Sequence, residues 1–468
     1  MTSMGRRAAL RAGLAATALA GGAALAAKPA AAAAALPATD DGWVSVLTHG
    51  AVGDGLTDDT AAIQAAFNAA RAATPNLGVL FPAGRTYRVS NRVTLSGLTD
   101  TALRGHGATL ALVDAAPVTV KDQVRGVLQI QDCHRLKVLG LNLVDDTAAY
   151  WYSGLIITAS TGIVVDGVVS RGFRHTGISV WDNTPGASND IVITNCTTED
   201  VRFGIASNGH DVRITNNHVA MDWLSSQEAE DWGGVWRAES KYYDGINVWY
   251  GADRTVISGN TITECGQAGV YTQQVTNLVV ADNTVSGCQL RGIEVDGSAR
   301  GSLPRSGQAV GVSITGNVAT NCVGHINVLS ARDVTVVGNR VENPNASRAV
   351  SCVAVHQGST KAVVVGNHLR QAHPSHPAVF VDTASVDVTL AWNAVEAAVP
   401  YQAPADTVII RRSGAGQIRT DGKLIAVGGI GVGNSVAATT PGAVVRKIEV
   451  FSSSGQSLGW VPVYNSIT

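Results

Sequence analysis

The sequence predicts an all-β fold, a right-handed parallel β-helix of roughly 10–13 coils with an N-terminal capping helix and a small C-terminal β-hairpin module. Three observations lead to this prediction: a repeated Asn frame, a second repeated frame that starts with Gly, and a composition of 51 Gly with only 5% aromatic residues. Short strands that repeat along a chain bury their apolar faces by stacking on the next coil. The 468 residues therefore form one long solenoid followed by a smaller module.

The first 36 residues are predicted to be an export signal. A basic start precedes a long Ala/Leu run with small residues at its end, which is the pattern of a secretory signal. Arg6 and Arg7 followed by Leu10 favour the twin-arginine type, while Ala9 in place of the usual aromatic leaves a plain secretory signal as the alternative. We therefore expect a secreted, extracellular protein without a membrane span, since no later segment is apolar for long enough.

Residues 43–412 carry the coils. The Asn frame reads apolar-x-x-Asn-x-apolar, as in ISGNTI at 257–262. Asn tolerates the left-handed backbone conformation of a sharp turn, and its amide can bond the equivalent amide about 4.8 Å away on the next coil. The frame thus predicts an amide ladder. Its members are Asn217, Asn260, Asn283, Asn317, Asn339, Asn367 and Asn393.

The cysteines follow the same repeat. Cys265, Cys288 and Cys322 each lie five residues after a ladder Asn, so they should stack on consecutive coils. Three stacked cysteines cannot all pair, and no zinc-type CxxC motif occurs. The pattern favours buried free thiols, with one disulfide as the alternative.

Residues 413–468 are predicted to form the C-terminal β module. KIEVFSSSGQSLGWVPVY at 447–464 has two alternating strands about a Ser-Ser-Gly turn, which is typical of a hairpin. The module either caps the last coil or mediates oligomerisation.

The N-terminal region resembles the pectate-lyase-like superfamily of parallel β-helix proteins. The resemblance rests on VLTHGAVGDGLTDDTAAIQAAFNAA at 46–70 and GVLFPAGRTYRV at 78–89. Asp58 to Thr60 can cap a helix whose apolar side includes Ile63 and Phe67, and this helix should cover the open end of the first coil. The superfamily includes glycoside hydrolases, polysaccharide lyases, epimerases and phage tailspikes. The polygalacturonase motif set is not assembled, since Gly105-His106-Gly107 occurs without matching aspartates.

The Gly frame places the candidate site. By resemblance, the strands that start with Gly belong to the sheet that carries the sugar groove, and their second and fourth residues after Gly point outward into a surface stripe. Two long loops, at 221–244 and 297–311, adjoin this stripe. The stripe comprises Ser179, Trp181, Ala206, Asn208, Asn247, Trp249, Tyr271, Gln273, Glu294, Asp296, Asn327, Leu329, Ala354 and His356.

Glu294 and Asp296 are the predicted catalytic residues. Glycoside cleavage needs an acid and a base or nucleophile about 5–9.5 Å apart, which two carboxylates at i and i+2 of a strand satisfy. Two close carboxylates also raise one another's proton affinity, which helps one of them remain protonated. The alternatives are a cation-binding pair and a solvated surface pair. Asp182, Asp244, His210, Lys241 and Arg291 are reserve acid or base candidates.

The aromatic and amide residues of the stripe are predicted to bind the substrate. Trp181, Trp249 and Tyr271 offer flat faces for sugar rings, and Asn247 and Gln273 offer hydrogen bonds to hydroxyls. With a net charge of −2 the chain shows no basic field for nucleic acid. The expected partner is therefore a polysaccharide or oligosaccharide.

The leading functional hypothesis is a glycoside hydrolase or transglycosidase. The second is a polysaccharide lyase that acts by β-elimination on a uronic acid polymer. It needs a base, and a cation such as Ca²⁺ or an Arg or Lys to neutralise the substrate carboxylate, and Tyr271, His210, Lys241 and Arg291 could supply these groups. The acidic stripe would repel such a polyanion unless a cation intervened. The third is a non-catalytic glycan-binding or tailspike-like adhesin. Only the lyase hypothesis requires a metal; no other cofactor is expected.

Overall fold

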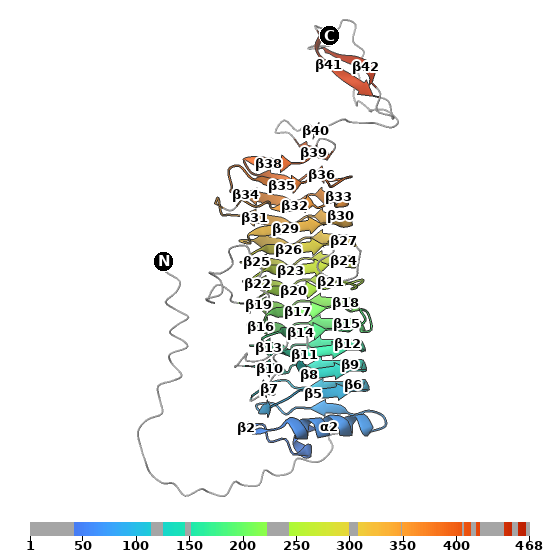
Figure 1. Ribbon diagram of the computed structural model, residues 1–468, viewed down its shortest axis with the longest axis vertical. Helices are drawn as coiled ribbons and strands as arrows, with labels where there is room; N and C mark the ends of the chain where they lie inside the picture. The colour runs from blue at the N-terminus through green and yellow to red at the C-terminus, as the bar shows by residue number, and fades with distance from the viewer. Residues whose placement is uncertain are drawn as a thin grey trace, which may run out of the picture. The chain divides into compact units, whose positions relative to one another are not determined.

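The structure is a computed structural model that describes residues 42–113, 125–145, 151–221, 243–298, 308–347, 349–404, 407–412, 418–421, 444–451 and 457–464. Successive strands rotate through three sheets, and equivalent strands of neighbouring coils stack on one another (Figure 1). The predicted parallel β-helix is confirmed. The predicted export signal at 1–36 lies outside the described residues.

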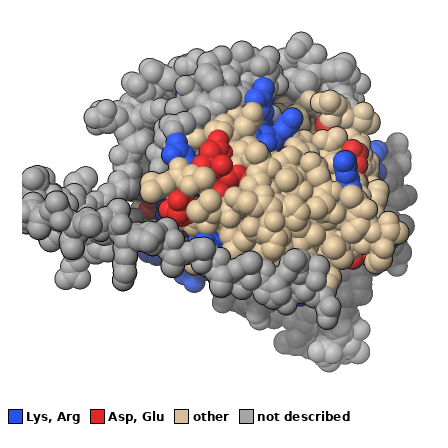
Figure 2. Space-filling model, turned by 90° about the horizontal axis from the view of Figure 1, so that it is seen from below, with Lys and Arg blue, Asp and Glu red and all other residues tan. Residues whose placement is uncertain are grey.

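The N-terminal cap is helix α2 (Thr60–Ala72), which follows the 3-10 helix η1 (Val46–His49). Ile63 and Phe67 are buried on its inner side, as the sequence predicts. Asp58 Oδ1 accepts a hydrogen bond from the Thr60 N–H at 3.0 Å, whereas the Asp59 carboxylate binds the N–H groups of residues 52 and 53 instead of the helix. Seen from below, this end is largely uncharged, with charged side chains gathered toward its margins (Figure 2).

Sheet A holds fifteen strands in the described part of the chain, all parallel except for the last pair. Its strands are β1 (Trp43–Ser45), β3 (Gly78–Leu80), β6 (Thr99–Arg104), β9 (His134–Leu139), β12 (Thr161–Asp166), β15 (Asn189–Thr194), β18 (His210–Thr215), β21 (Val256–Ser258), β24 (Thr276–Ala281), β27 (Ala309–Thr315), β30 (Ala331–Val337), β33 (Thr360–Val365), β36 (Thr389–Ala391), β39 (Val408–Arg412) and β40 (Ile418–Asp421).

Sheet B holds thirteen shorter strands within the described ranges. Its strands are β2 (Asp54–Asp58), β4 (Thr86–Val89), β7 (Thr109–Leu112), β10 (Asn142–Val144), β13 (Val169–Arg171), β16 (Thr197–Glu199), β19 (His218–Ala220), β22 (Thr261–Thr263), β25 (Thr284–Ser286), β28 (Val318–Thr320), β31 (Arg340–Asn343), β34 (His368–Gln371) and β37 (Ala394–Glu396).

Sheet C contains the strands of the Gly frame, and twelve of its strands lie in the residues described. These are β5 (Val93–Ser96), β8 (Arg125–Gln131), β11 (Tyr152–Thr158), β14 (Thr176–Val180), β17 (Phe203–Ser207), β20 (Asp244–Val248), β23 (Ala268–Gln273), β26 (Arg291–Asp296), β29 (Gly324–Leu329), β32 (Val353–His356), β35 (Pro377–Val381) and β38 (Val399–Gln402). Twelve and thirteen strands in sheets C and B agree with the predicted number of coils.

The interior of the solenoid is apolar. On β26, Ile293 and Val295 point inward and are fully buried, and Val280 and Val285 of the same coil face them from sheets A and B. Each such side chain stabilises the fold by about 1.5–3 kcal/mol when fully buried. The alternation leaves the neighbouring residues of each sheet C strand on the outer face, where the candidate site lies.

The predicted asparagine ladder is present between sheets A and B. Asn260 Nδ2 donates to Asn283 Oδ1 at 2.9 Å, and Asn283 Nδ2 donates to Asn317 Oδ1 at the same distance. The backbone N–H of each of these two residues binds the same oxygen of the next coil at 3.0 Å. All seven predicted members participate, from Asn217 to Asn393.

The prediction that the ladder Asn itself adopts the left-handed backbone conformation is wrong. The structure places positive φ on the residue before it. The ladder Asn uses both its N–H and its amide toward the next coil, so the sharp bend falls on its predecessor, where Gly is frequent. The left-handed residues are Asn216, Gly259, Asp282, Gly316, Gly338, Gly366 and Trp392.

The six cysteines are buried free thiols. Cys288 lies between Cys265 and Cys322 in a stack, and the contacts with Cys265 together with burial raise its pKa. The preferred prediction is therefore confirmed over the single disulfide. Beyond the coils, β41 (Val444–Phe451) and β42 (Ser457–Tyr464) form the predicted antiparallel hairpin.

Candidate active site

The outer face of sheet C stacks the predicted residues in register. Asn247 pairs with Tyr271, Tyr271 with Glu294, and Glu294 with Asn327, on four successive strands from β20 to β29. The column continues through Ala354 to Phe380. A second column, two residues further along each strand, contains Gln273, Asp296, Leu329 and His356. We call these two columns the outer columns.

The two predicted catalytic acids lie on this face but are not exposed. Glu294 is 4% exposed and Asp296 is 0% exposed, so the expectation of an open surface stripe and the alternative of a solvated pair are both wrong. Neighbouring side chains of the outer columns enclose both carboxylates, because large polar residues occupy the adjacent coils. Burial strengthens every charge interaction in this region.

Glu294 is held by a cation and a donor. Arg291 Nε, from the start of the same strand, forms an ion pair with Glu294 Oε2 at 3.3 Å. Asn327 Nδ2 donates to the same oxygen at 3.2 Å. His356 Nε2 lies 2.7 Å from Asn327 Oδ1, and since that oxygen only accepts, Nε2 carries the hydrogen. Arg291, a reserve base candidate, is thus the counter-ion of Glu294.

Asp296 uses both carboxylate oxygens within the fold. Tyr271 Oη donates to Asp296 Oδ2 at 3.2 Å. The Ser298 N–H donates to Oδ1 at 2.8 Å, and the Ser298 hydroxyl binds the same oxygen. These contacts fix the Tyr271 ring, which is itself buried, and the turn after β26. Asp296 is therefore better placed to position Tyr271 than to exchange protons with a substrate.

Asp244, a reserve candidate, has the most unusual environment of the acids. It is 1% exposed at the start of β20. Its Oδ1 accepts from the Ala268 N–H at 3.1 Å and its Oδ2 from Asn247 Nδ2 at 2.7 Å. Burial first, and the charge of Glu294 to a lesser degree, raise its pKa to about 8 against the effect of these hydrogen bonds and of the charge of Arg202. At neutral pH Asp244 therefore keeps its proton.

Among the described residues, the buried polar atoms of this face without a hydrogen bond include two on or next to β20. They are Asn247 Oδ1 and Trp249 Nε1, both buried on β20 or directly after it. A buried donor or acceptor without a partner destabilises a fold by about 1–3 kcal/mol. Such groups are explained when a ligand supplies the missing partner.

An aromatic cluster lies on the N-terminal side of Asp244. The rings of Trp181 and Trp249 meet edge to face at 4.9 Å, and Phe203 lies 6.0 Å from Trp249. The Arg202 guanidinium stacks over Phe203 at 5.4 Å and over Tyr243 at 4.9 Å. Trp181 and Trp249 are half-buried, so each keeps part of its surface accessible.

The other predicted site residues do not all lie on the outer face of sheet C. His210 is on sheet A, where its Nε2 contacts the Gly251 carbonyl at 2.9 Å. The Asp182 carboxylate accepts the backbone N–H groups of Ala159 and Ser188, each at 2.7 Å, which is a turn-stabilising role. Gln273 lies beside Asp296 in the second column. Lys241 lies outside the described residues.

The sequence reasoning missed several residues around Glu294. Arg202, and Phe380 at the far end of the first column, were not proposed for any role. Asn327 and His356 were placed in the stripe but not assigned to the site. Extending the outward register by one more coil would have found Phe380, whereas the side-chain contacts of Arg202 have no sequence signal.

Within the described ranges no group of three or more His, Cys, Asp or Glu residues could hold a metal ion. In the same part of the chain, no helix has the length and apolar character needed to cross a membrane.

Comparison with known proteins agrees with the fold. The family model "Right handed beta helix region" matches residues 147–369, and the model "Rhamnogalacturonase A/epimerase, pectate lyase-like" matches residues 43–131. Among solved structures, the Dettilon tailspike protein is similar with a TM-score of 0.64 and 18% identity, over 89% of this chain and 76% of that one.

Two curated phage proteins are similar in sequence. The tail spike protein of Salmonella phage epsilon15 is 26% identical over 229 residues, which is 44% of this chain and 21% of that protein. Depolymerase 1 of Klebsiella phage K5-2, specific for capsule K30/K69, is 25% identical over 266 residues, or 50% of this chain and 31% of that protein. The matches thus span less than a third of these relatives' length.

Proposed function

Because the chain belongs to the pectate-lyase-like superfamily of right-handed β-helix proteins, we propose that it is a carbohydrate-active enzyme that cleaves glycosidic bonds on the outer face of sheet C. The similarity to a tail spike and to a capsule depolymerase supports a polysaccharide or oligosaccharide as substrate. Export through the predicted signal at residues 1–36 is part of this proposal.

The observation that carries the proposal is the pair of unlike acids, Asp244 and Glu294. Asp244 is buried and its pKa is raised to about 8, whereas Glu294 has an ion pair with Arg291 and a hydrogen bond from Asn327. Glycoside cleavage needs one neutral acid and one ionised carboxylate, and Asp244 and Glu294 have the environments that favour these two forms. A purely structural pair of acids has no need for such different environments.

In the proposed mechanism, Asp244 donates its proton to the glycosidic oxygen while the bond from that oxygen to the anomeric carbon breaks. Glu294 either removes a proton from the attacking water, which inverts configuration, or attacks the anomeric carbon to form a glycosyl ester. In the second route, which retains configuration, Asp244 takes a proton from water and the water then cleaves this ester, which frees the Glu294 carboxylate. If a sugar hydroxyl replaces water, the same steps give transglycosylation. Asp296 acts as a positioning residue through Tyr271.

The β-elimination hypothesis has weaker support. Arg291, which was to neutralise a substrate carboxylate or act as base, is already paired with Glu294. Glu294 and Asp296, two residues apart on one strand, lie in the two outer columns, which disfavours a uronic acid polymer at the same place.

The test is incubation of the purified protein with plant, bacterial and fungal glycans, followed by reducing-end assay, mass spectrometry and ultraviolet absorbance. We expect saturated products from the wild type and none from Glu294→Gln. Glu396→Gln, at an exposed position of sheet B, is the matched control and should retain full activity. Products lighter by one water and carrying new absorbance would instead establish a lyase, and binding without products would establish an adhesin.

A further inference from the structure

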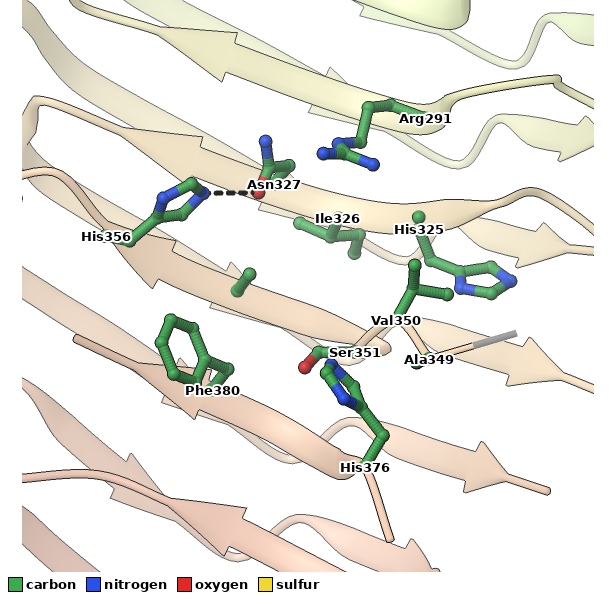
Figure 3. A pocket seen from close by; sticks show the side chains of 12 residues that line it. Arg291, His325, Ile326, Asn327, Ala349, Val350, Ser351, His356, His376 and Phe380 are labelled. Carbon is green, nitrogen blue, oxygen red and sulfur yellow. Dashed lines mark hydrogen bonds between the residues drawn. The ribbon is translucent and has the colours of Figure 1, made fainter. Parts of the chain in front are cut away.

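A cavity of about 230 Å³ opens on the outer face of sheet C, on the C-terminal side of Glu294. Figure 3 shows Arg291, Asn327, His356 and Phe380 around it, each from a successive strand of the sheet. Val350 and Ser351, from the segment before β32, form another part of its wall. The cavity is thus built from four coils and from the segments that precede β32 and β35.

The cavity is joined directly to Glu294. Two of its lining residues, Arg291 and Asn327, are the residues that contact Glu294 Oε2, at 3.3 Å and 3.2 Å. His356, which also lines the cavity, fixes the orientation of Asn327. A molecule that fills the cavity therefore lies beside the groups that hold this carboxylate.

The lining combines an apolar wall with separate hydrogen-bonding groups. Ala354 and Phe380 provide apolar contact, and the Phe380 ring is a flat surface. The Ser351 hydroxyl and the His356 ring provide donors and acceptors. A sugar ring has the complementary pattern, with C–H faces for stacking and hydroxyls at its rim.

The charge of the lining favours an uncharged ligand. Among the described residues that line the cavity none is Asp or Glu, and the one permanent cation in this described set, Arg291, is paired with Glu294. Burial lowers the pKa of His356 and that of His376, so both rings are neutral at neutral pH. A carboxylated sugar would find no free positive charge within this lining.

We propose that this cavity is a subsite for one uncharged sugar unit of the substrate. Its position next to the cleaved bond rests on the function proposed above, whereas the binding of the sugar unit does not. The subsite would select a neutral hexose or deoxyhexose at this point of the glycan, with Phe380 as the stacking surface and His356, Asn327 and Ser351 as hydroxyl contacts.

The test uses methyl glycosides of glucose, galactose, mannose and rhamnose, with glucuronic and galacturonic acid as charged competitors, in ligand-detected saturation-transfer NMR on the purified protein. Ala349→Trp should block the cavity, because Ala349 is an exposed lining residue. Ala346→Trp is the matched control, since Ala346 is exposed on the same segment but does not line the cavity.

We expect at least one uncharged methyl glycoside to bind the wild type and Ala346→Trp, and to lose its signal with Ala349→Trp. Phe380→Leu should weaken binding about three- to tenfold through lost stacking. Absence of binding by every neutral glycoside, binding by the two acids alone, or an unchanged signal with Ala349→Trp would each overturn the subsite.

These results are separable from those for the proposed function. If Glu294→Gln abolishes cleavage and Ala349→Trp leaves glycoside binding intact, the subsite is wrong and the catalytic proposal stands. If Ala349→Trp abolishes binding while Glu294→Gln still cleaves, the subsite stands and the role of Glu294 falls.

Discussion

Two stacked polar features run along this solenoid, the asparagine ladder and the outer columns of sheet C, and they differ in how their hydrogen bonds are satisfied. In the ladder the same residue recurs on each coil, and Asn260, Asn283 and Asn317 bind one another in series. In the first outer column the equivalent positions are Asn247, Tyr271, Glu294 and Asn327. Asn247 keeps a buried oxygen without a partner, and Glu294 depends on an ion pair.

This difference distinguishes residues that hold the fold together from residues that are candidates for a function. The repeat explains a column in which one residue type recurs on every coil, because each member forms hydrogen bonds with the equivalent residue of the next coil. Columns whose members differ, and which bury the carboxylates of Glu294 and Asp296, are not needed to hold the coils together. The comparison leads to three predictions, from the largest expected effect to the smallest.

The largest effect should come from Asp244→Asn. Loss of a general acid lowers kcat by about 10²–10⁴-fold, and the variant retains the shape of the side chain. Asp296→Asn should lower kcat less, since the Asp296 oxygens are bound to Tyr271 and Ser298. Steady-state kinetics on the cleaved glycan compares the two variants. A larger loss with Asp296→Asn would restore the pair first expected from the sequence, Glu294 and Asp296.

The second prediction concerns stability. Asn283→Ala removes the acceptor for both Asn260 Nδ2 and the Asn260 N–H, and leaves buried groups that destabilise the fold by about 1–3 kcal/mol. The same change at Asn393, which is half-buried at the end of the ladder, should have a smaller effect. Denaturant midpoints compare the two variants. Equal midpoint shifts at both positions would contradict the cooperative ladder.

The smallest expected effect is the loss of enzymatic activity at alkaline pH. The pKa of Asp244 is raised to about 8, so the acid form is present below that pH and is lost as the pH rises through it. Activity should therefore fall by roughly tenfold for each pH unit well above this value. Rates measured across this range, with binding followed separately, test the assignment. A profile that is flat through pH 8 and above would exclude Asp244 as the acid.

The fold could be predicted from the sequence because the repeat constrains it. The recurring asparagines of the ladder predicted where the turns lie, and the Gly frame predicted which residues of sheet C share its outer face. The predicted left-handed position was wrong by one residue. The sequence shows that an Asn recurs at each turn, but it does not show which hydrogen bonds that Asn makes. The C-terminal hairpin was predicted from its alternation alone.

The site was predicted less completely. The register of Glu294 and Asp296 followed from strand periodicity, but their burial and partners depend on side chains from other coils. Asp244 was only a reserve candidate, because its raised pKa arises from enclosure in the folded chain and from the charge of Glu294. Spacing along a strand carries no information about such enclosure.

The most direct test of the central claim is the protonation state of Asp244. The pKa of this carboxyl can be measured by ¹³C NMR with labelled aspartate, with the resonance assigned through Asp244→Asn. The account predicts a titration near pH 8, shifted to lower pH in Glu294→Gln because a neighbouring negative charge is removed. A titration near the ordinary value of about 3.9 would contradict the account.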